Sequence, residues 1–64
     1  MINTTLLRSL VGRRVAIHTN TGQSGYKDEG VIRTVDDQVI VLEGKNQEGL
    51  YFVIHNIRLI KVLE

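Results

Sequence analysis

The absence of cysteine is the feature that most constrains how this chain can fold, because the chain is only 64 residues long. A domain of this size buries only about 60% of the surface that its unfolded chain exposes. Chains this short commonly gain the missing stability from disulfides, a structural metal or association with other chains. Disulfides and thiolate metal sites are excluded, and the separated His18 and His55 make no zinc motif. We therefore expect a single domain spanning 1–64 that associates with copies of itself and holds no metal or cofactor.

The charge of the chain is almost balanced, with 8 Lys and Arg residues against 7 Asp and Glu residues. A domain that binds nucleic acid mainly through its overall charge is more basic than this. A symmetric ring could nevertheless concentrate a few cations in one place. The first residues carry neither a basic segment nor a long apolar one, and no apolar run is long enough to span a membrane. We expect a cytoplasmic protein with no membrane partner.

Residues 3–11 have the spacing of a short amphipathic helix. Its apolar residues recur at helical intervals and are Leu6, Leu7, Leu10 and Val11. Asn3 or Thr4 could cap the helix, because a short side-chain oxygen accepts hydrogen bonds from the free N–H groups of the first turn. Gly12 is suited to end it, because glycine tolerates positive φ.

After Gly12 the apolar residues alternate with polar ones, as in half-buried strands. We expect strands at about 13–20, 28–35, 38–43, 50–54 and 57–63, with a polar loop between the first two. Gly30 lies inside the second strand, where glycine often marks a bend, and Asp36 lies in the tight turn that follows. Five short strands are too few for a two-layer sandwich. We predict a mainly β fold, with a short N-terminal helix and a strongly bent antiparallel β-barrel.

Short motifs follow one another along the chain in a recognisable order. Residues 10–15 (Leu-Val-Gly-Arg-Arg-Val) join a helix end to a basic strand start, and residues 20–22 (Asn-Thr-Gly) look like a hairpin turn. Residues 35–42 read Val-Asp-Asp-Gln-Val-Ile-Val-Leu, and residues 54–57 read Ile-His-Asn-Ile. Together these motifs resemble the Sm/Lsm superfamily of small β-barrels, and the last two are similar to segments of its bacterial RNA chaperone Hfq.

The resemblance implies a helix followed by five strands, and closure of several copies into a homo-oligomeric ring. The fourth strand of one subunit would pair with the fifth of the next, giving a hexamer or a heptamer. Ring closure would also remove two exposed strand edges, which otherwise invite uncontrolled pairing. The implied function is binding of single-stranded RNA or short oligonucleotides on a ring surface. No set of nucleophile, base and orienting group is visible, so we expect no enzyme activity.

The candidate RNA-binding residues carry groups that suit base edges or phosphates. They are His55, Asn56, Arg58, Gln38, Arg8, Arg13 and Arg14. His55 and Asn56 would lie in a turn that faces the pore of a ring. The planar fork of arginine suits phosphate recognition. Structural roles are expected for Asp36, which would brace its turn by accepting backbone N–H groups, and for Gly30 at the bend of its strand.

Some positions depart from the family pattern. Asp37 and Gln38 stand where the family commonly places an aromatic or His residue that stacks on a base, and Ile54 replaces a lysine. Of the aromatic residues, Phe52 is expected in the core and Tyr51 at the interface made by the fourth strand. These departures leave two alternatives open. One is a protein-interaction or structural module that has lost nucleotide binding, and the other is a monomeric SH3-like barrel.

Overall fold

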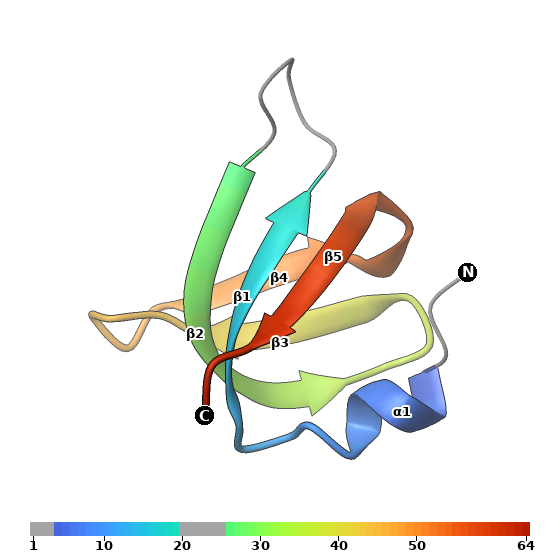
Figure 1. Ribbon diagram of the computed structural model, residues 1–64, viewed down its shortest axis with the longest axis horizontal. Helices are drawn as coiled ribbons and strands as arrows, with labels where there is room; N and C mark the ends of the chain where they lie inside the picture. Colours follow the sequence, from blue (N-terminus) through green and yellow to red (C-terminus); the bar gives the residue numbers. More distant parts are fainter. Residues whose placement is uncertain (1–3, 20–25) are drawn as a thin grey trace.

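The computed structural model describes residues 4–19 and 26–64. One short helix lies against one curved sheet (Figure 1). The elements are α1 (Thr4–Arg8), β1 (Arg14–Thr19), β2 (Tyr26–Val35), β3 (Val39–Glu43), β4 (Gly49–Val53), the 3₁₀ turn η1 (Ile54–Asn56) and β5 (Ile57–Val62). The expected mainly β fold, with five antiparallel strands and one short helix, is confirmed. The expected cap at Asn3 and the hairpin turn at residues 20–22 lie outside the described residues.

The helix is shorter than the apolar spacing predicts, because it ends at Arg8 rather than near Val11. The N–H groups of Ser9, Leu10 and Val11 each bond to the carbonyl three residues earlier. Such bonds belong to tighter turns than the α-helix and commonly finish one. Gly12 then adopts a φ of 89°, and its N–H donates to Ile32 O at 2.7 Å. The backbone just after the helix is therefore hydrogen-bonded to β2.

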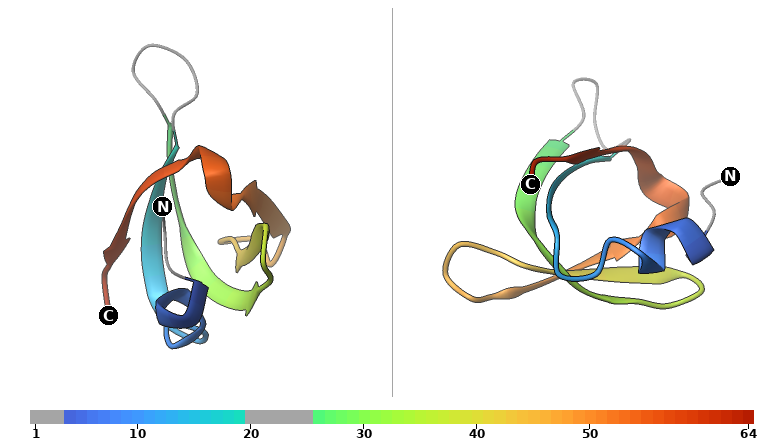
Figure 2. Two further views of the ribbon diagram at one scale, coloured as in Figure 1. Left: turned by 90° about the vertical axis from the view of Figure 1, so that its right-hand side faces the viewer. Right: turned by 60° about the horizontal axis from the view of Figure 1, so that its bottom comes forward.

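The strands form one sheet in the order β4-β3-β2-β1-β5. β2 is 10 residues long and curved, so that its first half pairs with β1 and its second half with β3 (Figure 1). Figure 2 shows the same curl from two further sides, with α1 beside the turn between β2 and β3. β4 and β5 are the two end strands, and within the described residues no ladder joins them to close a barrel.

The curvature of β2 depends on a close approach between its backbone and that of β3. A Cβ atom at Gly30 would lie 2.5 Å from the backbone oxygen of Glu43 and 3.1 Å from its carbonyl carbon. Any side chain at Gly30 would therefore force the two backbones apart. The β2–β3 register also shifts between Ile32 and Thr34. Such bulges increase local bending and twist.

Alternate residues of the strands turn toward a single core, as the two-residue period of a strand dictates. Its buried members are Leu7, Val15, Ile17, Ile32, Val35, Ile40, Leu42, Ile54 and Ile57. Leu7 attaches α1 to this core, and Ile54 attaches η1. Both short elements also contact the turn between β2 and β3, α1 through Arg8 and η1 through the backbone of Ile54. In 4–19 and 26–64, no helix is long and apolar enough to cross a membrane.

The core is incompletely covered where the sheet is open. Leu50 and Phe52 of β4 and Ile60 of β5 pack against the core and remain partly exposed. Val62 lies opposite the buried Val15 in the β1–β5 ladder, yet 42% of it is exposed. Residues directly opposite in an antiparallel ladder share a face, so Val62 points toward the core side. Apolar surface therefore continues to the free edges of both end strands.

Candidate functional site

The structure divides the seven candidate RNA-binding residues between two places. Arg8, Gln38, His55 and Asn56 come from α1, the β2–β3 turn and η1, and Arg58 follows η1 on β5. Arg13 and Arg14 lie at the start of β1, beside the last residue, Glu64. We call the residues Arg8, Asp37, Gln38, His55 and Asn56 the turn cluster.

Hydrogen bonds between backbones bring the turn cluster together. The N–H group of Ile54 donates to Gln38 O at 2.9 Å, which joins η1 to the β2–β3 turn. Within that turn, Asp36 N–H donates to Val39 O at 2.8 Å, and the Asp36 carboxylate accepts from Asp37 N–H at 2.8 Å. Asp36 therefore serves the turn itself.

Arg8 fastens α1 to the same turn. Its Nη2 lies 3.2 Å from Asp37 Oδ1, and its Nε donates to Val35 O at 3.4 Å. The two charged side chains are 51% and 84% exposed, so the pair contributes about 0–1 kcal/mol. Arg8 and Asp37 neutralise each other. Arg8, a candidate phosphate contact, is thus already paired with a carboxylate.

The remaining side chains of this region are free. His55, Asn56 and Arg58 are all exposed. Within the described part of the chain, no hydrogen bond or ion pair engages their side chains. Imidazole, amide and guanidinium groups are all available here to an incoming base or phosphate.

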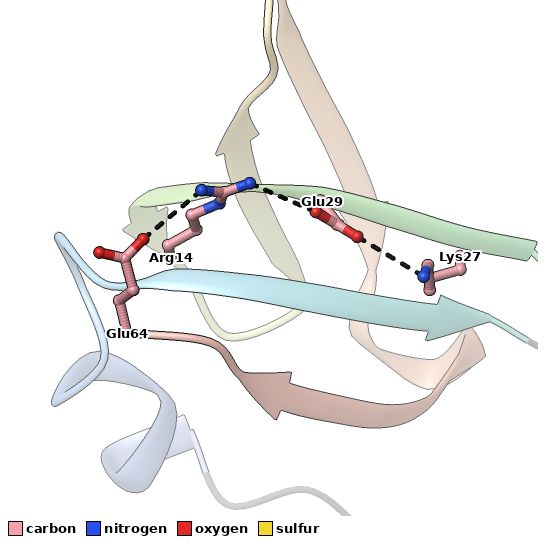
Figure 3. A network of polar contacts seen from close by, with 4 residues as sticks. All are labelled: Arg14, Lys27, Glu29 and Glu64. Atoms are coloured by element: carbon pink, nitrogen blue, oxygen red, sulfur yellow. Dashed lines mark hydrogen bonds and ion pairs between the residues drawn. The ribbon is translucent and has the colours of Figure 1, made fainter.

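The arginines at the start of β1 belong to a network of opposite charges. Arg14 lies between Glu64 and Glu29, at 3.4 and 3.5 Å, and Lys27 lies 3.5 Å from Glu29. Figure 3 shows how these four side chains follow one another. Arg13 Nε donates to the backbone oxygen of Glu64. Two cations and two carboxylates balance within the network that Figure 3 draws. A phosphate that approaches Arg14 would meet the repulsion of these carboxylates.

A hollow on the outer side of β2, β3 and β4 was not predicted from the sequence. Its volume is about 600 Å³. The residues lining it are Arg33, Thr34, Asp36, Val39, Val41, Gly49 and Tyr51. Tyr51 is 75% exposed. The signal that could have revealed the hollow is strand alternation, since Val39, Val41 and Tyr51 fall on the face opposite the core residues Ile40 and Leu42.

No protein-family model, curated protein or solved structure matches this chain. Among the described residues, no group of three His, Asp or Glu side chains could hold a metal ion. The function must therefore be inferred from the two end strands, β4 and β5, and from the exposed polar groups of the molecule itself.

Proposed function

We propose that the protein is an Sm-like small β-barrel module that assembles into a homo-oligomeric ring and binds single-stranded RNA or short oligonucleotides. The observation that carries this proposal is the pair of open end strands. β4 and β5 lie at opposite ends of the strand order, and both present partly exposed apolar residues beside the core.

The two edges suit each other physically. An end strand presents unpaired N–H and C=O groups along its length. Pairing β4 of one copy with β5 of the next would satisfy both rows. It would also cover Leu50 and Phe52 of one copy with Ile60 and Val62 of the other. Burial of apolar surface contributes about 25 cal/mol per Å², and a chain of 64 residues has few other sources of stability.

The proposed contact is head-to-tail, because it joins two different edges. Head-to-tail contacts repeat until they close into a ring or continue as a filament. A ring leaves no strand edge exposed. A hexamer or heptamer is the ring size implied by the resemblance of residues 35–42 and 54–57 to the Sm/Lsm superfamily.

RNA binding is proposed at the turn cluster and the adjoining Arg58. Among the described residues the polar groups of His55, Asn56 and Arg58 have no partner, and ring symmetry would repeat each group around the assembly. The ion pair between Arg8 and Asp37 removes the repulsion that Asp37 alone would exert on phosphate. The affinity would therefore come from base and phosphate contacts of the free groups rather than from a strongly basic surface.

The test is a mass measurement by light scattering on protein purified with and without nuclease treatment. The proposal expects an oligomer in both samples, and nucleic acid co-purifying only without nuclease. A monomer would overturn the ring and would favour a monomeric SH3-like barrel. An oligomer that binds neither uridine-rich nor adenine-rich single strands at low salt would overturn RNA binding.

One observation favours a second candidate function, a protein-interaction or structural module. Two of the candidate arginines are balanced by carboxylates, Arg8 by Asp37 and Arg14 by Glu29 and Glu64. Under this alternative the ring forms, but neither the original protein nor the His55→Ala variant binds RNA. Under the main proposal His55→Ala weakens RNA binding and leaves the oligomer mass unchanged.

A further inference from the structure

The hollow on the outer side of β2, β3 and β4 combines an apolar floor with an exposed aromatic ring. Val39 and Val41 of β3 line it, and both point away from the core, because Ile40 between them is buried. Val41 lies opposite Tyr51 of β4, so these two side chains share the outer face. The two valines and the ring together form a surface that suits an aliphatic chain.

Tyr51 presents most of its ring to solvent. The residue is 75% exposed, and a Cβ atom at Gly49 would lie 3.4 Å from its Cε1 atom, so one edge of the ring lies close to the β4 backbone. Within the described residues, no hydrogen bond engages its hydroxyl group. The face of an aromatic ring carries partial negative charge and attracts a cation placed over it. Tyr51 therefore offers a cation a contact surface on the outer face.

Asp36 leaves an uncompensated negative charge at the rim of the hollow. Arg33, the other charged residue that lines it, is paired through Nε with a Glu43 carboxylate oxygen at 3.4 Å. The Asp36 carboxylate accepts from Asp37 N–H through Oδ1, and within the described residues it forms no ion pair. Its second oxygen, Oδ2, is thus available to a donor from another molecule. The hollow therefore favours a cation and disfavours a phosphate.

The rim also carries donors, which a bare cation could not use. The two terminal amino groups of Arg33 have no partner among the described residues, and Thr34 adds an exposed hydroxyl group. A free polyamine has no acceptor oxygen, so it would desolvate the Arg33 groups without pairing them, at a cost in affinity. A peptide supplies a backbone carbonyl oxygen beside every side chain. The combination of donors, carboxylate, ring and apolar floor thus fits a basic residue within a polypeptide.

We propose that this hollow binds a lysine side chain of a partner protein. The aliphatic stem of the lysine lies on Val39 and Val41, as long cationic side chains commonly cover apolar surface with their stems. Its ammonium group contacts the ring of Tyr51 and Asp36 Oδ2, and a neighbouring backbone carbonyl accepts from Arg33. This inference goes beyond RNA binding and does not depend on it, because no residue of the turn cluster lines the hollow.

Amide chemical shifts measure this binding, because they detect the weak contact that a single side chain makes. The probe is the peptide N-acetyl-Gly-Lys-Gly-amide, which should shift the amides of Val39, Val41 and Tyr51 at millimolar concentration. The same peptide with norleucine keeps an aliphatic stem but lacks the ammonium group, and should bind at least about 5-fold more weakly. Spermidine carries ammonium groups but no carbonyl oxygen, and should also bind more weakly. The proposal is overturned if the lysine peptide shifts none of these amides, or if norleucine or spermidine binds as tightly.

Substitutions in the hollow test the two contacts of the ammonium group. Tyr51→Leu keeps apolar surface but removes the ring, and should weaken binding of the lysine peptide about 2- to 30-fold, whereas Tyr51→Phe keeps the ring and should retain the affinity. Asp36→Asn removes the charge, but its amide oxygen can still accept from Asp37 N–H, and binding should weaken about 2- to 5-fold.

A matched control separates this contact from the overall charge of the protein. Asp28 also lies on β2 and forms no ion pair among the described residues, but it does not line the hollow. Asp28→Asn should therefore leave the affinity unchanged, and a loss equal to that of Asp36→Asn would overturn the inference. Shifts of the same amides by a single-stranded oligonucleotide but not by the lysine peptide would assign the hollow to nucleic acid instead. A changed oligomer mass in Tyr51→Leu would assign it to a second copy, which would also overturn the inference.

Discussion

Replacement of Gly30 by alanine tests whether the curvature of the sheet depends on close backbone contact. The added Cβ atom would lie 2.5 Å from Glu43 O, whereas a carbon and a carbonyl oxygen in contact are about 3.3–3.6 Å apart. β2 and β3 would have to separate by roughly 1 Å. Interstrand hydrogen bonds of about 2.9–3.0 Å cannot stretch by that amount and persist.

The cost follows from these displacements. Adding a methyl group to a tightly packed place costs about 1–3 kcal/mol, and each lost interstrand bond about 0.5–1.5 kcal/mol. The lower entropy of an unfolded chain with alanine offsets about 0.4–1 kcal/mol. We expect Gly30→Ala to lower the free energy of unfolding by about 2–4 kcal/mol. A domain of this size has about 3–10 kcal/mol in total.

Two other glycines provide matched controls. Gly12 has nothing within 4 Å of a Cβ atom but a φ of 89°, so Gly12→Ala should cost about 1–2 kcal/mol through backbone strain alone. A Cβ atom at Gly49 makes only an ordinary contact, so Gly49→Ala should be neutral or stabilising by up to about 1 kcal/mol. Urea unfolding followed by far-UV circular dichroism, at several protein concentrations, measures all three. The reasoning is refuted if Gly30→Ala costs no more than Gly49→Ala.

Three further predictions concern assembly, a loop and an ion pair. Val62→Asp should lower the oligomer mass measured by light scattering, because Val62 lies on the core side of the end strand β5. Val31→Asp is the control and should leave that mass unchanged, because Val31 is similarly exposed, at 38%, but lies on β2 inside the sheet. Gln47→Gly should stabilise the fold by about 0.5–1 kcal/mol in urea unfolding, since Gln47 has a φ of 64°, and a destabilised variant would contradict this. A double-mutant cycle with Arg8→Ala and Asp37→Ala should give a coupling below about 1 kcal/mol, and a larger value would mean that the pair is shielded from water.

Strand periodicity predicted the elements because it is a local property. Ile40 and Leu42 alternate along β3 and are buried as alternation requires. In β1, Ala16 is buried together with Val15 and Ile17, so burial there does not follow the alternation. The ends of α1 were harder to place. Leu10 and Val11 continue the helical spacing of Leu6 and Leu7, but Gly12 bonds to Ile32 across the sheet and stops the helix early. Contacts between distant residues override local preference here, and spacing alone carries no information about them.

The candidate site was predicted less well, because its electrostatics depend on such distant contacts. Arg8 and Asp37 are 29 positions apart, and Arg14 and Glu64 are 50 apart. The sequence identifies each charge but not its partner. Tyr51 illustrates the same difficulty. Alternation places it on the outer face, but only the neighbouring strands show that Arg33, Asp36 and two valines surround it there.

If the protein binds RNA as proposed, its paired arginines determine how the RNA affinity depends on salt. Salt weakens nucleic-acid binding in proportion to the number of phosphates that the protein neutralises, through release of counterions. A phosphate that displaces Glu29 or Glu64 from Arg14 frees a carboxylate that repels it, so such a contact yields little net neutralisation. Arg58 has no such competitor among the described residues. A ring of these chains would therefore hold RNA through a few free cations and through contacts to the bases, which salt weakens far less than contacts to phosphate.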